Sequence, residues 1–171
     1  MPRSARDAFE VGAAVLHAFD TSDQITRYLV EHVDDAAWRA APPGGKGRTI
    51  AAIVAHVHAV RGMWVKAASG AAPTPLDAAQ ATRAEALDAL GESHAALRAT
   101  VAAALAGDGR IAGFKPDVVG FIGYFVAHEA HHRGQIAMLA RQTGHPLPKE
   151  VGFGMWAWGT RGAAVSAPGA A

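Results

Sequence analysis

Proline and glycine cluster at a few points of the chain and divide most of it into four long segments. The strongest breaker is Pro42-Pro43-Gly44-Gly45, and others stand near Pro73 and Gly107. Inside the segments, apolar residues recur every three or four positions, as in an amphipathic helix, and no segment alternates convincingly with a period of two. The sequence therefore predicts an all-α protein, with helices at about residues 4–37, 50–69, 76–106 and 117–143.

Residues that favour helix ends refine these boundaries. Thr49 is placed to cap the second helix, and Gly144 stands just beyond the fourth. Asp20-Thr21-Ser22-Asp23 brings cap-type residues into the middle of the first segment, which marks a candidate break in that helix.

Four long helices joined by short loops are typical of a four-helix bundle. About 40 of the 171 residues are Ala, which favours closely packed helices. We expect a single domain over residues 1–160 and a disordered tail over 161–171. Residues 151–159 look too rich in Gly for a helix and too aromatic for a solvated tail. We expect them to pack on the bundle, either as a plug at one end or as the wall or lid of a ligand pocket.

Composition excludes several classes of function. The net charge is +1 and the basic residues form no stripe, so nucleic-acid binding is not expected. The chain has no Cys, which excludes disulfides, thiolate metal sites and a Cys nucleophile. No apolar run reaches the roughly 18 residues of a membrane span, and no signal peptide is visible. We therefore expect a cytoplasmic protein that does not bind membranes.

Two histidines one helical turn apart are the strongest chemical feature of the sequence. His128 and His132 fall at the centre of the apolar stripe of the fourth helix, and Gln135 joins them. Each buried imidazole needs a partner, because an unsatisfied polar group costs about 1–3 kcal/mol. A divalent metal would satisfy both. The alternative is a pair of core histidines that bond to neighbouring helices.

A metal site needs a third ligand, and three residues are candidates for it. His56 and His58 flank the apolar stripe of the second helix on opposite sides, so periodicity does not choose between them. His94 lies within the apolar stripe of the third helix, where a hydrogen-bonded core histidine is the alternative interpretation. Trp64 and Trp156 could supply aromatic pocket walls.

Residues 128–132 also match the H-E-x-x-H pattern of zinc proteases, in which the Glu acts as general base. The longer form of the motif fails, since Gln135 and Met138 stand where Gly and His are required. Glu129 and Arg133 are spaced i, i+4 on the far side of the helix, as expected for a solvated ion pair. We therefore do not expect a protease.

Residues 128–136, HEAHHRGQI, are similar to the H-x-x-x-H-R-G-Q-[ILV] signature on the last bundle helix of the DinB-like (YfiT-like) metalloproteins. Residues 48–57, RTIAAIVAHV, resemble the second-helix segment that leads to the first ligand in that family. The Pro-Pro-Gly-Gly loop, residues 147–150 and the Trp-rich tail also fit, and the likeness extends over roughly residues 10–160.

The resemblance implies a four-helix bundle with a three-histidine site for zinc or nickel, whose ligands here would be His56, His128 and His132. It implies an up-down-down-up helix order, in which the segment around Pro73 and Pro75 must run the length of the bundle. Homodimers are frequent in the family. Several relatives use the metal to activate a low-molecular-weight thiol (mycothiol, bacillithiol or glutathione) for transfer or isomerisation.

Three neutral imidazoles would leave a bound divalent ion with at least one open position, where the pKa of a water or thiol is lowered. Because the chain has no Cys, a thiol nucleophile would have to arrive as a cosubstrate. The sequence thus predicts a metal-dependent thiol S-transferase or related hydrolase that acts on a small molecule. The alternatives are a metal-binding or stress-related protein without turnover, whose site the tail, His58 or His94 would seal, and a purely structural bundle.

Overall fold

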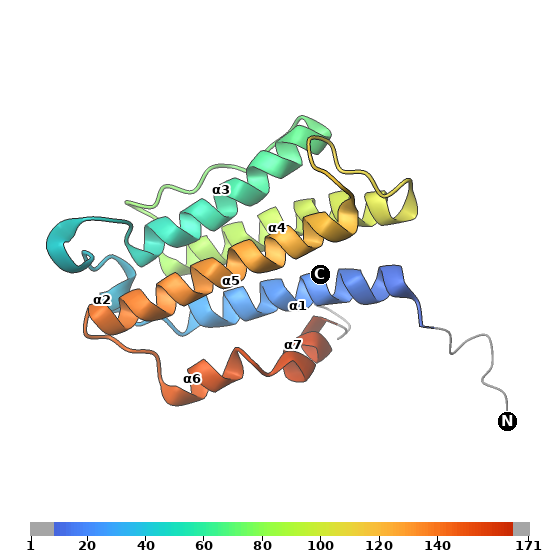
Figure 1. The fold of residues 1–171 in the computed structure, drawn as a ribbon. Helices are drawn as coiled ribbons and strands as arrows, with labels where there is room; N and C mark the ends of the chain where they lie inside the picture. Colours follow the sequence, from blue (N-terminus) through green and yellow to red (C-terminus); the bar gives the residue numbers. More distant parts are fainter. Residues whose placement is uncertain (1–8, 166–171) are drawn as a thin grey trace, which may run out of the picture.

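The computed structural model describes residues 9–165, and four long helices form its body (Figure 1). Among these residues there is no strand, which confirms the predicted all-α helical bundle. The long helices are α1 (Val11–Glu31), α3 (Ile50–Ser69), α4 (Arg83–Ala106) and α5 (Val118–Gln142). The shorter elements are α2 (Asp35–Trp38), the 3₁₀ turn η2 (Pro43–Gly45), α6 (Lys149–Gly154) and α7 (Trp158–Val165).

Capping side chains start three of the four long helices. The hydroxyl of Thr49 accepts a hydrogen bond from the backbone of α3, as predicted, and Asp117 does the same for α5. Thr82 and Glu85 form a reciprocal capping box at the start of α4. The predicted start of this helix near Leu76 is therefore wrong, because residues 70–82 form a non-helical connection with a turn at 78–80.

The predicted break in the first helix is also wrong. α1 runs without interruption through residues 20–23, and Asp20, Thr21, Ser22 and Asp23 are all buried. Asp20, Ser22 and Asp23 bond to side chains of neighbouring helices. The hydroxyl of Thr21 donates to the carbonyl oxygen of His17 within α1, so none of the four starts a new helix. The chain does turn later, after Glu31, and the short helix α2 follows with Asp34 as its cap.

The four long helices run up-down-down-up (Figure 1). α3 and α4 point the same way. The connection 70–82 joins the end of α3 to the start of α4 and therefore returns along the whole bundle. The thirteen residues 70–82 could reach at most about 43 Å if fully extended, and the turn at 78–80 shortens this reach. The 20-residue helix α3 is about 30 Å long. The later start of α4 thus supplies the chain length that this topology requires.

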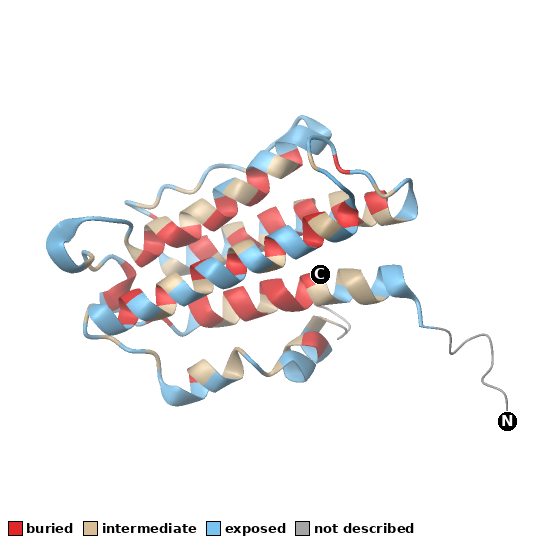
Figure 2. Ribbon diagram, in the orientation of Figure 1, coloured by how far each residue is buried: buried red, intermediate tan, exposed pale blue. Residues whose placement is uncertain are grey.

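The interior consists of two apolar clusters with polar side chains between them. One cluster includes Leu29, Val54 and Ile136, and the other includes Phe19, Val65 and Phe125. The buried polar residues lie between the two clusters on every long helix: Asp20, Thr21, Ser22, Asp23 and Thr26 on α1, His58 and Arg61 on α3, Ser93 and His94 on α4, and Glu129 and His132 on α5. Figure 2 shows the buried faces of the helices turned inward.

The C-terminal segment is helical, contrary to the prediction. α6 and α7 follow α5 and lie along the outside of α1 (Figure 1). Val151 is buried against the bundle, and the guanidinium of Arg161 covers the ring of Tyr28 at 3.6 Å. Residues 161–165 of the expected disordered tail belong to α7, and residues 166–171 lie outside the described part of the chain.

Candidate metal centre

Three histidines from two helices converge between α3 and α5. His56 comes from α3, and His128 and His132 come from successive turns of α5. One ligand nitrogen from each lies within 4.8 Å of the other two. The Nε2 atoms of His128 and His132 are 3.1 Å apart, close to the roughly 3.3 Å between two nitrogens of a tetrahedral zinc site. The cluster can therefore hold a metal ion.

The surroundings of the three rings favour ligation over ordinary hydrogen bonding. The amide oxygen of Gln135 accepts a hydrogen bond of 2.8 Å from His132 Nδ1. This bond places the proton on Nδ1 and leaves the Nε2 lone pair directed at the site. His56 makes no hydrogen bond with any described residue, and Nδ1 of His128 is buried without a partner among them. A metal ion would take the lone pairs of His56 and of the two facing Nε2 atoms, with Nδ1 of His128 on the far side of its ring.

The three imidazoles are held in their neutral, metal-binding form. Burial and the neighbouring histidines His132 and His56 lower the pKa of His128 to about 4. Burial, followed by the positive charge of Arg48, lowers the pKa of His56. Burial also lowers the pKa of His132, although the bond to Gln135 opposes this shift. A metal ion thus competes with few protons near neutral pH.

Aromatic side chains form one wall beside the histidines. Tyr124 stacks on the ring of His128, with 5.8 Å between ring centroids. Trp64 makes edge contacts with Tyr124 and Phe121, and its indole N–H is buried without a partner among the described residues. The predicted wall residue Trp64 is therefore near the site, next to the tyrosine that touches a ligand histidine.

The other third-ligand candidates lie elsewhere. His58 is buried with one nitrogen 2.9 Å from the carbonyl oxygen of Ala89 and the other 2.8 Å from that of Thr74. His94 donates from Nε2 to the carboxylate of Asp20 at 2.9 Å. Both are hydrogen-bonded core histidines, so neither belongs to the three-histidine cluster.

Trp156 is also remote from the three histidines. It is 80% exposed and lines a groove of about 460 Å³ between the end of α5 and α6. Neither any of the three histidines nor Gln135 lines that groove. The C-terminal segment thus packs on the bundle, but neither as an aromatic plug nor as a lid over the histidines.

Sequence reasoning misplaced Glu129 and Arg133. The predicted solvated pair is inside the bundle: Glu129 is 2% exposed and accepts two hydrogen bonds from Arg61, at 2.6 and 2.8 Å. Arg133 reaches the hydroxyl of Thr26 at 2.9 Å. Because Glu129 is engaged in this way, the H-E-x-x-H match lacks the free carboxylate that a protease base requires.

Arg61 was missed altogether, although a signal for it was present. It follows Val57 and precedes Val65 by four residues each, so it continues a buried stripe of α3. Glu129 likewise stands between Phe125 and Ile136 on α5. Opposite charges within two apolar stripes indicate a buried ion pair between helices.

Comparison with known proteins agrees with this architecture. The model of the DinB superfamily matches residues 18–136, more than half of the chain, and this range includes all three histidines and Gln135. No curated protein and no solved structure matches the chain. Within the described part of the chain, no helix has the length and apolar character needed to cross a membrane. The chain belongs to the DinB superfamily.

Proposed function

We propose that His56, His128 and His132 bind a divalent metal ion, zinc or nickel, and that the protein uses it in an enzymatic reaction on a small molecule. The observation that carries this proposal is the convergence of three neutral imidazoles from two helices. Three protein ligands and one open position are typical of catalytic rather than structural zinc sites.

A low-molecular-weight thiol is the cosubstrate that fits this chain best. A bound divalent ion would lower the pKa of a thiol or water and so supply a nucleophile near neutral pH. The chain itself has no Cys. Arg48 supports an anionic thiol, because its guanidinium is exposed, acts electrostatically on both His56 and His132, and makes no ion pair with any described residue. It could receive a carboxylate of the incoming molecule.

The surroundings of the site favour turnover over simple metal storage. A sealed site would need a fourth protein ligand or a covering segment. His58 and His94 are not available as a fourth ligand, because each is hydrogen-bonded to other groups. The helices α6 and α7 do not cover the histidines, because they lie along α1 (Figure 1). Two of the three ligand rings, those of His56 and His128, are only half-buried.

Metal content and thiol transfer test the proposal together. Elemental analysis of tag-free protein should find about one zinc or nickel ion per chain in the wild type, and none in the variant His128→Ala/His132→Ala. The exposed neighbour His131 provides a matched control, since His131→Ala should retain the metal. Loaded protein is then assayed with mycothiol, bacillithiol and glutathione against electrophilic small molecules. A folded wild type that takes up neither metal would refute the proposal.

A further inference from the structure

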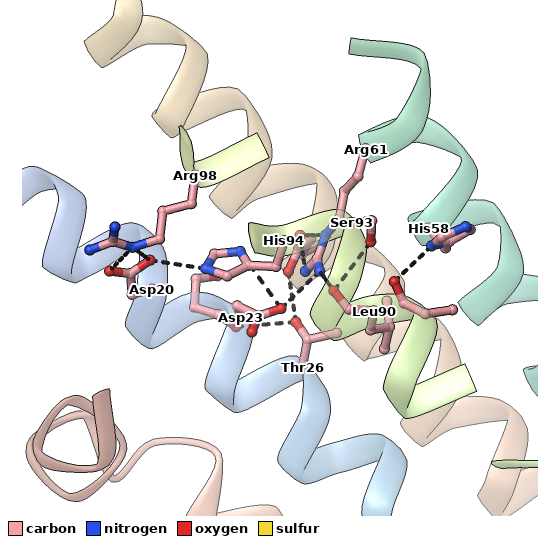
Figure 3. Close-up of polar contacts among 12 residues, drawn as sticks. Asp20, Asp23, Thr26, His58, Arg61, Leu90, Ser93, His94 and Arg98 are labelled. Atoms are coloured by element: carbon pink, nitrogen blue, oxygen red, sulfur yellow. Dashed lines mark hydrogen bonds and ion pairs between the residues drawn. The ribbon is translucent and has the colours of Figure 1, made fainter. Parts of the chain in front are cut away.

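A cluster of buried charges lies in the middle of the bundle, beside the histidine site. Arg61 is completely buried and lies at its centre (Figure 3). Its guanidinium contacts Asp23 of α1 at 2.8 Å, the carbonyl oxygen of Leu90 of α4 at 2.9 Å, and Glu129 of α5 at 2.6 Å. One side chain of α3 is thereby bonded to all three other long helices.

Both carboxylate oxygens of Glu129 also accept hydrogen bonds. One carboxylate oxygen accepts both bonds from Arg61, and the other accepts a bond of 2.8 Å from Thr26 on α1. Burial alone would raise the pKa of Glu129, but the charge and hydrogen bonds of Arg61 hold it below its ordinary value. Both partners are thus charged, and the geometry of their contact is bidentate on the arginine side.

Arg61 and Glu129 stand close in sequence to the histidines of the cluster. Arg61 lies five residues after His56 on α3, and Glu129 is adjacent to His128 on α5. The pair therefore joins the two helices that carry the three imidazoles, at the level of the site. His56 of α3 touches the two histidines of α5 only through ring contacts, which impose far less precise a distance between the helices than charged hydrogen bonds do.

We propose that the Arg61–Glu129 pair is a positioning device that fixes the spacing between α3 and α5, so that the three histidines are arranged for a metal before it binds. The inference rests on the metal site of the proposed function. A ligand set on two helices loses affinity when the helices must be drawn together during binding, because part of the binding free energy is spent on that ordering.

A second buried ion pair in the same cluster supplies the matched control. Asp20 of α1 accepts hydrogen bonds from His94 and Arg98 of α4. Asp20→Asn removes a buried carboxylate charge, as Glu129→Gln does, but it loosens α1 against α4 and leaves the link between α3 and α5 intact.

The test measures metal affinity apart from stability. Zn²⁺ dissociation constants are obtained by chelator competition for wild type, Glu129→Gln, Arg61→Lys and Asp20→Asn, together with the visible spectrum of the Co²⁺ form and thermal unfolding of the metal-free protein. Glu129→Gln and Arg61→Lys should each weaken Zn²⁺ binding by about tenfold or more and change the Co²⁺ spectrum. Asp20→Asn should lower the unfolding temperature, yet leave affinity within about twofold and the spectrum unchanged.

Folded Glu129→Gln and Arg61→Lys proteins with wild-type affinity and spectrum would overturn the inference while leaving the metal site itself established. Equal losses of affinity in Asp20→Asn would also overturn it, since they would show a general effect of stability. A wild type that binds no metal would instead refute the proposed function. Should the two charge variants fail to fold, Glu129→Asp preserves both charges but shortens the side chain that reaches Arg61, and the same criteria decide.

Discussion

His56 and His58 stand two residues apart on one helix, yet their rings face different chemical groups. His58 lies between two carbonyl oxygens, whereas His56 faces two other imidazoles. The periodicity of the sequence places the two histidines symmetrically about an apolar stripe. The resemblance to the DinB-like metalloproteins selected His56, and the hydrogen-bond partners of His58 show why His58 does not join the three-histidine cluster.

Gln135 makes a single hydrogen bond to His132, one of the three proposed metal ligands. Replacing it with Ala removes the acceptor that fixes the Nε2 lone pair toward the site, so the affinity for Zn²⁺ should fall by about 10–100-fold. Chelator competition measures the change. Met138→Ala, at an exposed position one turn further along α5, serves as the control and should bind normally. Unchanged affinity in Gln135→Ala would show that packing alone orients His132.

Arg48 allows a test of the charge of the substrate. Thioglycolate is an anionic thiol and 2-mercaptoethanol a neutral one, and both should perturb the visible spectrum of the Co²⁺ protein. Arg48→Gln should weaken thioglycolate binding by about tenfold, equivalent to the roughly 1.4 kcal/mol of one charge-assisted contact, and leave 2-mercaptoethanol unaffected. Lys46→Gln, in the same exposed loop, should change neither. An equal effect on both thiols would exclude anion recognition by Arg48.

At the scale of elements, α1 shows how tertiary contacts override local signals. Asp, Thr and Ser favour helix caps because their side chains compete for backbone groups. In α1 the carboxylate of Asp20 instead binds His94 and Arg98 on α4, and Asp23 pairs with Arg61 on α3. These partners are distant in sequence, so a local pattern predicts a break where the bundle has an uninterrupted, buried helix.

The Asp20 contacts give a defined pH dependence of stability. Burial raises the pKa of Asp20, but the hydrogen bonds and charges of His94 and Arg98 outweigh it and hold the pKa below its ordinary value. Because the folded-state pKa is lower than the unfolded one of about 3.9, the stabilisation is present above that value and is lost as the pH falls through the folded pKa.

Asp20→Asn should therefore lower the free energy of unfolding by about 1–3 kcal/mol at pH 7, and the difference from wild type should shrink below about pH 4. Urea unfolding of the metal-free proteins at several pH values measures it. Asp88→Asn, at an exposed position on α4, should match the wild type throughout. A difference that stays constant down to pH 3 would contradict the assigned role of the carboxylate.

At the scale of the whole molecule, the connection 70–82 determines the helix order. It runs the length of the bundle and lets α3 and α4 lie parallel (Figure 1). His58 fastens it by bonding to Thr74 in the connection and to Ala89 in α4. One buried side chain of α3 thus ties the crossing segment to the helix that follows it.

His58→Phe should destabilise the protein without weakening metal binding at the proposed site. The substitution removes the ring nitrogens that lie 2.9 and 2.8 Å from two carbonyl oxygens. The lost hydrogen bonding costs about 1–3 kcal/mol and should lower the thermal unfolding temperature of the metal-free form. Metal content by elemental analysis should stay at the wild-type level. Loss of the metal in a folded His58→Phe protein would mean that His58 takes part in ligation after all.

The local sequence was sufficient to predict the features that depend on the geometry of a single helix. The helical period, the breakers and the Thr49 cap predicted α3 and α5 closely, and the i, i+4 spacing placed His128 and His132 together, because both are geometric properties of a single helix. The start of α4, the burial of Glu129 and the roles of His58, His94 and Trp156 were decided by the tertiary structure. Each depends on which groups of other helices lie opposite, and a carboxylate inside a bundle is stable only where an arginine such as Arg61 meets it.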